Sequence, residues 1–329
     1  MIVQLHEILQ KRDEATKQGS RLNAITMAEL QKQKFPPRQY IVPGLIPARG
    51  LTLLVAKPKM RKSFFVLDLA ICVNMQQKFL SLETKQGAVL YVTLEDDSQR
   101  IQERSRLMFP QHVADWQWSE NLHFAYDCPR MDEGGLEAIS NWHHDMIARG
   151  QKPCFIAIDV FQRIRPRTQK GQDKYEVDYD AVGQIKTLSA TVDTPIILVH
   201  HARKMDGTDT LDVVSGSQGI AGAADNIFII RKDKTGEMIF EVLGRDVEPM
   251  TLLATFDAGR WRVDNYEYEP MTKDQRQIKD FLQENGEKTL KEIATNFGED
   301  NTNRLRKMME RMATEGQITR PRHGFYGFK

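Results

Sequence analysis

Residues 51–64, LTLLVAKPKMRKSF, decide the fold of this chain. The run 51–55 is apolar and β-branched, as in a buried strand, and residues 64–73 form an apolar run that indicates a buried helix. A strand, a loop and a helix in this order are the setting of the phosphate-binding loop G-x-x-x-x-G-K-[ST]. The sequence therefore predicts such a loop at residues 56–63, with an ordinary basic strand-to-helix turn as the alternative.

The loop keeps one end of that pattern and departs from it at both glycine positions. Lys62 and Ser63 are present, whereas Ala56 and Arg61 replace the glycines. In such a loop, backbone N–H groups surround the phosphates, the lysine reaches the β- and γ-phosphates, and the hydroxyl binds Mg²⁺. We therefore predict ATP contacts from Ala56, Lys57, Pro58, Lys59, Met60, Arg61, Lys62, Ser63 and Phe64.

Arg61 puts a long side chain where the loop wraps the β-phosphate, a place where glycine leaves room for the ligand. Three outcomes are open. The guanidinium turns outward and binding is weakened, or it contacts phosphate as an additional charge, or the nucleotide site is inactive and the domain serves as a scaffold. Ala56 costs little if its backbone keeps a negative φ.

Composition places the chain among globular proteins with one large and one small domain. The 329 residues carry 46 Lys+Arg against 45 Asp+Glu, so any basic surface for nucleic acid must be local. The three cysteines have no metal-ligand spacing, and Cys72 and Cys154 in apolar runs suit reduced core residues. Because no signal peptide and no apolar stretch of membrane-spanning length is present, we expect a cytoplasmic protein without membrane contact.

Strand and helix signals alternate along residues 51–257, which favours an α/β fold with a mostly parallel sheet flanked by helices. The expected strands are 51–55, 88–94, 122–126, 154–158, 195–199, 226–230, 238–243 and 251–257. The last three are joined by short turns, so the sheet should end in antiparallel strands. Helices are expected at 97–108, 134–149 and 176–192.

Two smaller parts flank this α/β domain, which we place at residues 38–264. Residues 1–37 are polar and helix-prone, and they predict a helical arm that packs either on its own domain or on a neighbouring subunit. Residues 270–329 have the outline of a winged helix-turn-helix, with two strands after helices at 273–284, 289–296 and about 302–315.

Polar residues follow the expected strands directly, at the edge where an open parallel sheet binds ligands. Asp159 suits an Mg²⁺ ligand acting through water, with a helix N-cap as the alternative. Glu95 suits a general base for water, although its acidic neighbours would also suit a solvated turn. Of His200 and His201, only one faces the site if the strand continues through them, because side chains alternate along a strand.

The short motifs of this chain, taken in their order along the sequence, resemble those of the RepA-type hexameric helicases of plasmids and phages, a RecA-like P-loop ATPase family. The resemblance spans about residues 40–260. Its pieces are short, but their order is specific: Pro43-Gly44-Leu45-Ile46, 50–55, Leu94-Glu95-Asp96, Ile158-Asp159, 163–166, Tyr175, Asp178-Tyr179, 200–204, 215–217, 222–225 and Gly244-Arg245-Asp246.

This resemblance implies a RecA-like ATPase domain that uses ATP and Mg²⁺ and assembles into a ring, with a hexamer expected. Lys62 matches the loop lysine, and Ser63 and Asp159 match the metal-binding positions. Glu95 matches the catalytic glutamate. His201 matches the position that senses the γ-phosphate, with a shift by one residue to His200 left open.

Family rings complete each site with an arginine from the next subunit. Arg245, in a Gly-Arg-Asp turn between the late strands, is the first choice for this role, and Arg231 is the second. Either could instead be an ordinary surface arginine paired with Asp246 or Asp233.

Family rings also contact single-stranded DNA through channel loops, and residues 163–174 and 203–216 fit by position, with Tyr175 or Tyr179 able to stack on bases. Solvated surface loops are the alternative. The third C-terminal helix and the wing suit phosphate contacts to duplex DNA, with a protein-contact module as the alternative. The candidates are Arg165, Arg167, Lys170, Arg203, Lys204, Arg304, Arg306, Lys307, Arg311 and Arg322.

The sequence thus predicts a DNA-dependent ATPase, a ring-forming helicase or helicase-like motor in the replication of a plasmid, phage or other mobile element. One alternative is a replication initiator or loader scaffold that binds DNA and has an impaired ATPase. The other is a RecA-like ATPase of DNA repair or defence without unwinding activity.

Overall fold

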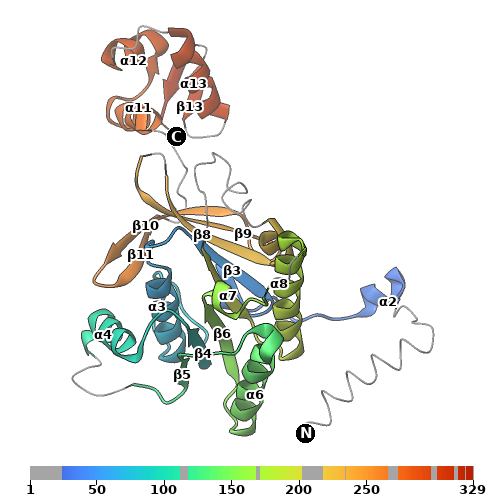
Figure 1. Cartoon of the computed structure of the whole chain (residues 1–329). Helices are drawn as coiled ribbons and strands as arrows, with labels where there is room; N and C mark the ends of the chain where they lie inside the picture. Colours follow the sequence, from blue (N-terminus) through green and yellow to red (C-terminus); the bar gives the residue numbers. More distant parts are fainter. Residues whose placement is uncertain are drawn as a thin grey trace. The chain divides into compact units, whose positions relative to one another are not determined.

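The structure is a computed structural model, and Figure 1 shows its elements along the chain. It describes residues 24–111, 118–167, 171–201, 218–233, 235–265, 273–297, 302–314, 318–322 and 324–328. Its contacts separate a unit at Met1–Arg38 from a unit at Gln39–Lys329. That boundary lies next to the predicted limit of the N-terminal arm, while the division of the remainder into two domains stays a prediction.

A nine-stranded sheet forms the centre of the α/β region, with the spatial order β11-β10-β9-β8-β3-β7-β6-β4-β5. Five consecutive pairings from β8 to β5 are parallel, as the alternating pattern predicted. The parallel strands are β3 (Leu51–Ala56), β4 (Ala88–Thr93), β5 (Leu122–Ala125), β6 (Pro153–Asp159), β7 (Ile196–His201) and β8 (Asn226–Lys232).

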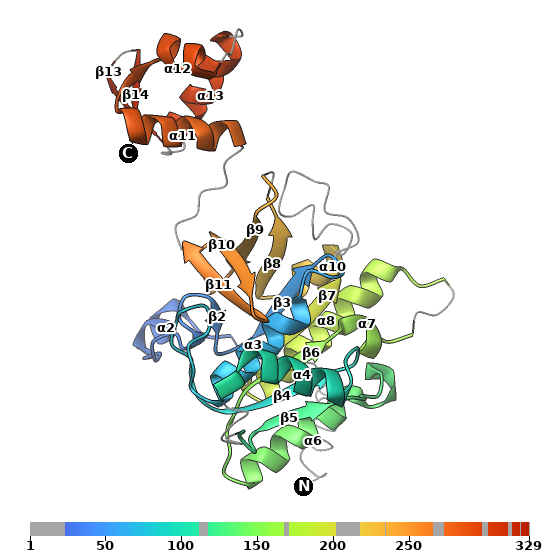
Figure 2. The same ribbon diagram turned by 90° about the vertical axis from the view of Figure 1, so that its left-hand side faces the viewer.

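Helices cover both faces of this sheet, and Figures 1 and 2 show the layers from two directions. One face carries α3 (Lys62–Asn74) and α4 (Ser98–Met108). The other carries α6 (Gly135–Ala148), α7 (Phe161–Ile164), α8 (Lys174–Thr191) and α10 (Gln218–Ala223). The expected helices at 97–108, 134–149 and 176–192 correspond to α4, α6 and α8.

Strand β3 shows why the sequence runs apolar through the centre of the sheet. Leu51, Leu53 and Val55 join the core on the α8 face, whereas Leu54 and Ala56 join the core on the α3 face. Successive side chains point to opposite faces, so a strand covered on both sides must be apolar at nearly every position. The pattern that predicted a buried strand is therefore explained.

The sheet ends in antiparallel strands, which confirms the expectation from the short turns. β8 pairs with β9 (Met238–Gly244), and β9 pairs with β10 (Met250–Asp257). The sequence reading missed the last strand, β11 (Arg260–Asn265), which pairs with β10. The tight turn at Ala258-Gly259, with φ of 47° and 81°, closes this β10–β11 hairpin.

The β10–β11 hairpin is attached to α3 through a buried ion pair. Arg260 Nε donates to Asp68 Oδ1 at 2.9 Å, and its guanidinium also reaches Cys72 Sγ at 3.2 Å and lies over the Phe109 ring at 4.5 Å. The Asp68 side chain is fully buried. Burial raises the pKa of Asp68 to about 6, although Arg260 favours the charged form.

Asp68 should therefore make stability depend on pH in the acidic range. The folded state holds the Asp68 proton up to about pH 6, whereas the unfolded state releases it near pH 3.8, so stability falls as the pH rises between these values. From about pH 5 to about pH 7 we expect the wild type to lose about 1 kcal/mol of unfolding free energy relative to Asp68→Asn. Urea unfolding of both proteins at the two pH values measures it, and an unchanged difference would contradict it.

Several short elements accompany the central sheet. The pair β1 (Tyr40–Val42) and β2 (Ile46–Pro47) precedes the central sheet in sequence, and η1 (Met131–Glu133) precedes α6. In the N-terminal unit, α2 (Met27–Lys32) begins with a capping box between Thr26 and Glu29 and has no buried residue. No helix in the described part of the chain is long and apolar enough to cross a membrane.

The C-terminal residues build a small core of their own. Three helices, α11 (Lys273–Asn285), α12 (Leu290–Phe297) and α13 (Thr302–Thr314), accompany a three-stranded antiparallel sheet of order β12-β14-β13. The strands are β12 (Lys288–Thr289), β13 (Thr319–Arg322) and β14 (Phe325–Gly327). Buried side chains from all three helices form the core, together with two from beside and within the sheet: Ile278, Leu282, Ile293, Leu305, Met309, Met312, Ile318 and Tyr326.

Candidate functional site

The register of the parallel strands brings the predicted polar residues to one edge of the sheet. Ala56, where the loop begins, lies opposite His201 on β7, and Thr93 lies opposite Asp159 on β6. Since β7 and β6 are neighbours, the loop, His201, Asp159 and the end of β4 follow one another along this edge. The pairing of these strands therefore brings the predicted site residues close together.

Lys62 lies in the first turn of α3 and points back into the loop. Its Nζ donates to the carbonyl oxygens of Ala56 at 3.2 Å and Lys57 at 3.0 Å, and the residue is only 4 % exposed. Burial lowers the pKa of Lys62 to about 8, while Asp159 and Glu95 oppose the shift by attracting the ammonium. The ammonium is thus mostly charged at neutral pH and is held by groups that a phosphate oxygen could replace.

Arg61 takes a backbone conformation that glycine adopts more readily. It has φ 59° and ψ 32° at the N-cap of α3, in the left-handed region. Its guanidinium carbon lies 4.1 Å from the centre of the Phe256 ring on β10. Of the three outcomes expected for Arg61, this placement agrees with the outward-turned guanidinium; its effect on binding stays a prediction.

Asp159 is the buried acid of the site. It is 2 % exposed, its Oδ2 accepts the Tyr91 hydroxyl at 2.8 Å, and the Ser63 hydroxyl also hydrogen-bonds to it. Burial raises the pKa of Asp159, and the bonds from Ser63 and Tyr91 oppose that shift. Ser63 and Asp159, the two predicted metal-binding positions, are therefore neighbours at this edge of the sheet.

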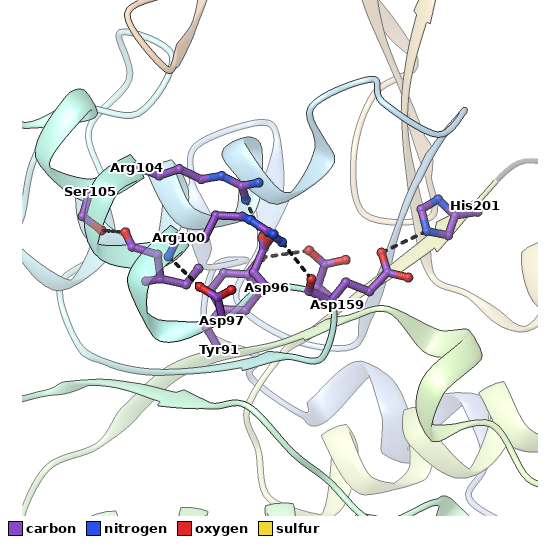
Figure 3. A network of polar contacts seen from close by, with 10 residues as sticks. Tyr91, Asp96, Asp97, Arg100, Arg104, Ser105, Asp159 and His201 are labelled. Atoms are coloured by element: carbon purple, nitrogen blue, oxygen red, sulfur yellow. Dashed lines mark hydrogen bonds and ion pairs between the residues drawn. The ribbon is translucent and has the colours of Figure 1, made fainter.

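Glu95 and His201 meet beside this pair, as Figure 3 shows for the polar network of the site. His201 Nε2 lies 3.4 Å from Glu95 Oε2, and both side chains are partly exposed, 34 % and 46 %. His200 is nearly buried, and its ring packs against Phe161. Of the two histidines, His201 is the one in contact with Glu95.

The segment that carries Glu95 is held by its acidic neighbours (Figure 3). Asp96 accepts from Arg100 at 2.9 Å and also binds Arg104, and Asp97 caps α4 by accepting the Arg100 backbone N–H at 2.8 Å. Asp96 and Asp97 are thus structural, which argues against a freely solvated acidic turn around Glu95. The sequence reading missed Tyr91 and Arg104; a tyrosine inside the apolar β4 run was the available signal for the first.

The oxygen atoms of Ser63 and Asp159 at this edge of the sheet suit Mg²⁺, as do the metal-binding residues of a phosphate-binding loop. Mg²⁺ prefers oxygen ligands and usually keeps several waters, with one or two protein groups and substrate phosphates completing its shell. Ser63 and Asp159 supply one hydroxyl and one carboxylate at neighbouring positions. Among the described residues no group of three or more His, Cys, Asp or Glu side chains could hold a metal ion alone.

The two candidate arginines for action between subunits lie at opposite ends of the neighbouring strands β8 and β9. Arg231, near the end of β8, forms a paired contact with Glu241 across to β9, with Nε to Oε2 at 2.9 Å. Arg245, after β9, has a side chain that is 70 % exposed and lies 3.9 Å from Asp225. Arg245 is therefore available to another molecule, whereas Arg231 is committed to Glu241.

The side chains predicted to contact DNA differ in their exposure to solvent. Arg165 is only 7 % exposed and is ion-paired with Asp178, so its side chain supports the α7–α8 region and does not reach the surface as expected. Arg167 is exposed and lies 2.9 Å from Glu133. Lys170, Arg203 and Lys204 lie outside the described residues.

Two aromatic and several basic residues remain on accessible surfaces. Tyr175 and Tyr179 stack on each other at the start of α8, with an interplanar angle of 13°, and both are nearly half exposed.

In the C-terminal part, Leu305, Met309 and Met312 face the core, so the basic residues of α13 face outward. Exposed there are Arg304, Arg306, Lys307, Arg311 and, on β13, Arg322.

Comparisons with known proteins agree with this arrangement. A family model described as an AAA domain matches residues 16–207, more than half of the chain. A solved structure described as an ATPase domain matches with a TM-score of 0.50 at 15 % sequence identity, covering 78 % of this chain and 97 % of that one. No curated protein sequence matches the chain. The fold is thus that of a RecA-like ATPase domain, which confirms the resemblance drawn from the sequence.

Proposed function

We propose, since the chain belongs to the AAA domain family, that it is a DNA-dependent ATPase that works as a ring-forming helicase or helicase-like motor. Replication of a plasmid, phage or other mobile element is the process in which we place it. One observation carries the proposal: Lys62, Ser63, Glu95, Asp159 and His201 come from four different segments and gather at one edge of the sheet.

Each of these side chains has a defined task in phosphoryl transfer to water. The Lys62 ammonium leaves the carbonyl oxygens of the loop and neutralises the phosphate oxygens. Glu95 accepts the proton of the attacking water. His201, in contact with Glu95, couples the position of that carboxylate to the presence of the terminal phosphate. Mg²⁺, when bound, is held by Ser63 and by Asp159 through water, and it supplies charge neutralisation.

Tyr91 positions the buried carboxylate of Asp159 through a hydrogen bond. Its hydroxyl donates to Asp159 Oδ2, which keeps the pKa of that carboxyl from rising further. We expect Tyr91→Phe to move the acidic limb of the ATPase pH profile to higher pH and to lower turnover about tenfold at neutral pH. Steady-state rates from about pH 5 to 9 measure this, and Tyr126→Phe, an exposed tyrosine, is the matched control. A profile equal to that of the control would contradict the role.

Local features of the surface support DNA binding. Single-stranded nucleic acid is bound by aromatic side chains that stack on bases together with cations that follow the backbone. The exposed Tyr175–Tyr179 pair and Arg167 provide such groups near the start of α8. Outward-facing basic residues of α13 suit duplex phosphates, and three helices with a small antiparallel sheet suit a winged helix.

A second candidate function is favoured by Arg61. An arginine at a glycine position of the loop is the change expected in an initiator or loader scaffold with an impaired ATPase. Turnover of ATP with and without single-stranded DNA separates the two functions. No activity above that of Lys62→Ala would favour the scaffold, and recovery of turnover in Ala56→Gly/Arg61→Gly would show that only the loop is impaired.

Three further experiments test ring assembly, the role of Arg245 and DNA unwinding. Native mass spectrometry with ATP and Mg²⁺ should show a ring, with a hexamer expected, and nucleotide bound to its subunits. Arg245→Ala should keep the ring and the nucleotide but lose most turnover, because a residue that acts on the next subunit is needed only for hydrolysis. A strand-displacement assay distinguishes a helicase from a repair or defence ATPase that hydrolyses ATP without unwinding.

A further inference from the structure

An aromatic cluster of Phe64, Phe256 and Trp261 lies directly against the phosphate loop, and Phe256 and Trp261 have no role in the proposed chemistry. Phe64, in the first turn of α3, meets the edge of Phe256 on β10 at 5.3 Å between ring centres. Phe256 in turn packs on Trp261 of β11 at 5.0 Å. The whole cluster comes from the β10–β11 hairpin and the start of α3, so it links the far end of the sheet to the loop.

Arg61 joins this cluster to the loop through two contacts. The guanidinium carbon lies 4.1 Å from the centre of the Phe256 ring, within the range of a cation–π contact. The Trp261 indole Nε1 donates to the Arg61 carbonyl oxygen at 3.4 Å. That same oxygen accepts the first backbone hydrogen bond of α3, from Phe65 N at 3.1 Å. Side chain and backbone of one residue are thus held by two aromatic residues.

Arg61 needs such support because of its backbone. A residue with a Cβ is disfavoured in the left-handed region, whereas glycine enters it freely. At φ 59° Arg61 nevertheless lies in this region, which glycine at the same position would enter without strain. The hairpin that supplies the contacts is itself fixed to α3, through Arg260 and the buried Asp68.

We propose that the β10–β11 hairpin positions the phosphate loop, with Phe256 and Trp261 holding Arg61 in the left-handed conformation and its guanidinium outside the loop. A loop that has arginine in place of its second glycine thereby keeps the backbone N–H groups of Lys62 and Ser63 directed at phosphate. Phe256 and Trp261 act through Arg61 and are therefore positioning residues in this arrangement. The inference rests on the proposed function insofar as the loop binds nucleotide.

A double-mutant cycle between Arg61 and Phe256 tests the proposal, with Mg²⁺–ADP titrated by calorimetry into the full chain. Phe256→Leu should raise the Kd about threefold to tenfold when Arg61 is present, the range that a cation–π contact of this kind supports. In the Arg61→Gly background the same substitution should change the Kd less than about twofold, because glycine needs no support. Phe256→Tyr keeps the ring face and should match the wild type.

Thermal unfolding of the four proteins separates positioning from packing. Loss of the contacts with Phe64 and Trp261 should lower the Tm in both backgrounds, whereas the change in Kd should appear only with Arg61. An equal change of Kd in both backgrounds, or none with Arg61 present, would overturn the inference. If Phe256→Leu does not fold, Trp261→Phe, which removes the indole donor and part of the ring volume but keeps an aromatic ring, replaces it in the cycle.

Hydrogen exchange provides a readout that needs no nucleotide. The amides of Lys62 and Ser63 should exchange faster in Phe256→Leu than in the wild type, and equally fast in Arg61→Gly with or without Phe256. If the wild-type chain binds no Mg²⁺–ADP, the proposed function fails. The exchange rates then decide the positioning role separately, because equal rates in wild type and Phe256→Leu would refute it.

Discussion

Replacing Lys62 by alanine should reduce ATP turnover about 100-fold or more, because a charged clamp on the transferring phosphoryl group is lost. The structure places the Lys62 ammonium at the mouth of the loop, within 3.2 Å of two carbonyl oxygens and in the field of Asp159 and Glu95. A phosphate-release assay measures the effect. Lys152→Ala, an exposed lysine paired with Asp193, is the matched control and should keep wild-type turnover. Equal rates in the two variants would contradict the role of Lys62.

The same substitution should change stability in a way that identifies the buried ammonium. With its pKa lowered to about 8, the folded state releases the Lys62 proton before the unfolded state does, so stability rises with pH between about 8 and 10.5. From about pH 8 to about pH 10 the wild type should gain about 2 kcal/mol of unfolding free energy relative to Lys62→Ala. Denaturant unfolding at both pH values checks this, and a parallel response of the two proteins would contradict it.

Glu95→Gln should separate nucleotide binding from hydrolysis. The amide keeps the size of the side chain but cannot accept a proton, and loss of general base catalysis lowers rates about 10²- to 10⁴-fold. Binding should change less than about threefold, because phosphate is held by the loop. Turnover and calorimetric Kd for Mg²⁺–ADP are the two measurements.

Glu103→Gln on α4 provides the control for Glu95→Gln. Glu103 is exposed and accepts from Gln99 one turn earlier, at 2.8 Å. Its substitution should leave both turnover and Kd unchanged. If Glu95→Gln retains full turnover, the general base must be another group, and the role assigned to the Glu95–His201 contact is wrong.

The loop and its strand were predictable because they depend on local sequence. An apolar strand, a basic turn and an apolar helix specify β3, the loop and α3 without reference to the rest of the chain. The polar residues after the apolar strands were predictable for a related reason, since parallel strands end at one edge whatever their order. Glu95, Asp159 and the pair His200–His201 needed only that rule, whereas the preference for His201 came from the family resemblance.

Other features depended on partners distant in sequence. Arg165 looked like a surface cation, yet Asp178 on the next helix draws it into the interior. The sequence placed Arg245 before Arg231 only because of its Gly-Arg-Asp turn, and it gave no sign that Glu241 on the neighbouring strand binds Arg231. β11 was missed although Arg260, Arg262 and Asp264 alternate with Trp261 and Val263, which is the pattern of a half-buried strand. The run is short, and its place in the sheet follows only from its pairing with β10.

The sequence by itself determined the α/β order of elements, the position of the phosphate loop and the identity of the polar residues at its edge, because short-range periodicity and strand direction encode them. The tertiary structure alone decided how Arg61 is accommodated. Its guanidinium lies over Phe256, and its carbonyl oxygen accepts from Trp261, which lies 200 residues further along the chain. No local pattern can reveal such a contact, since it exists only after the β10–β11 hairpin packs against α3.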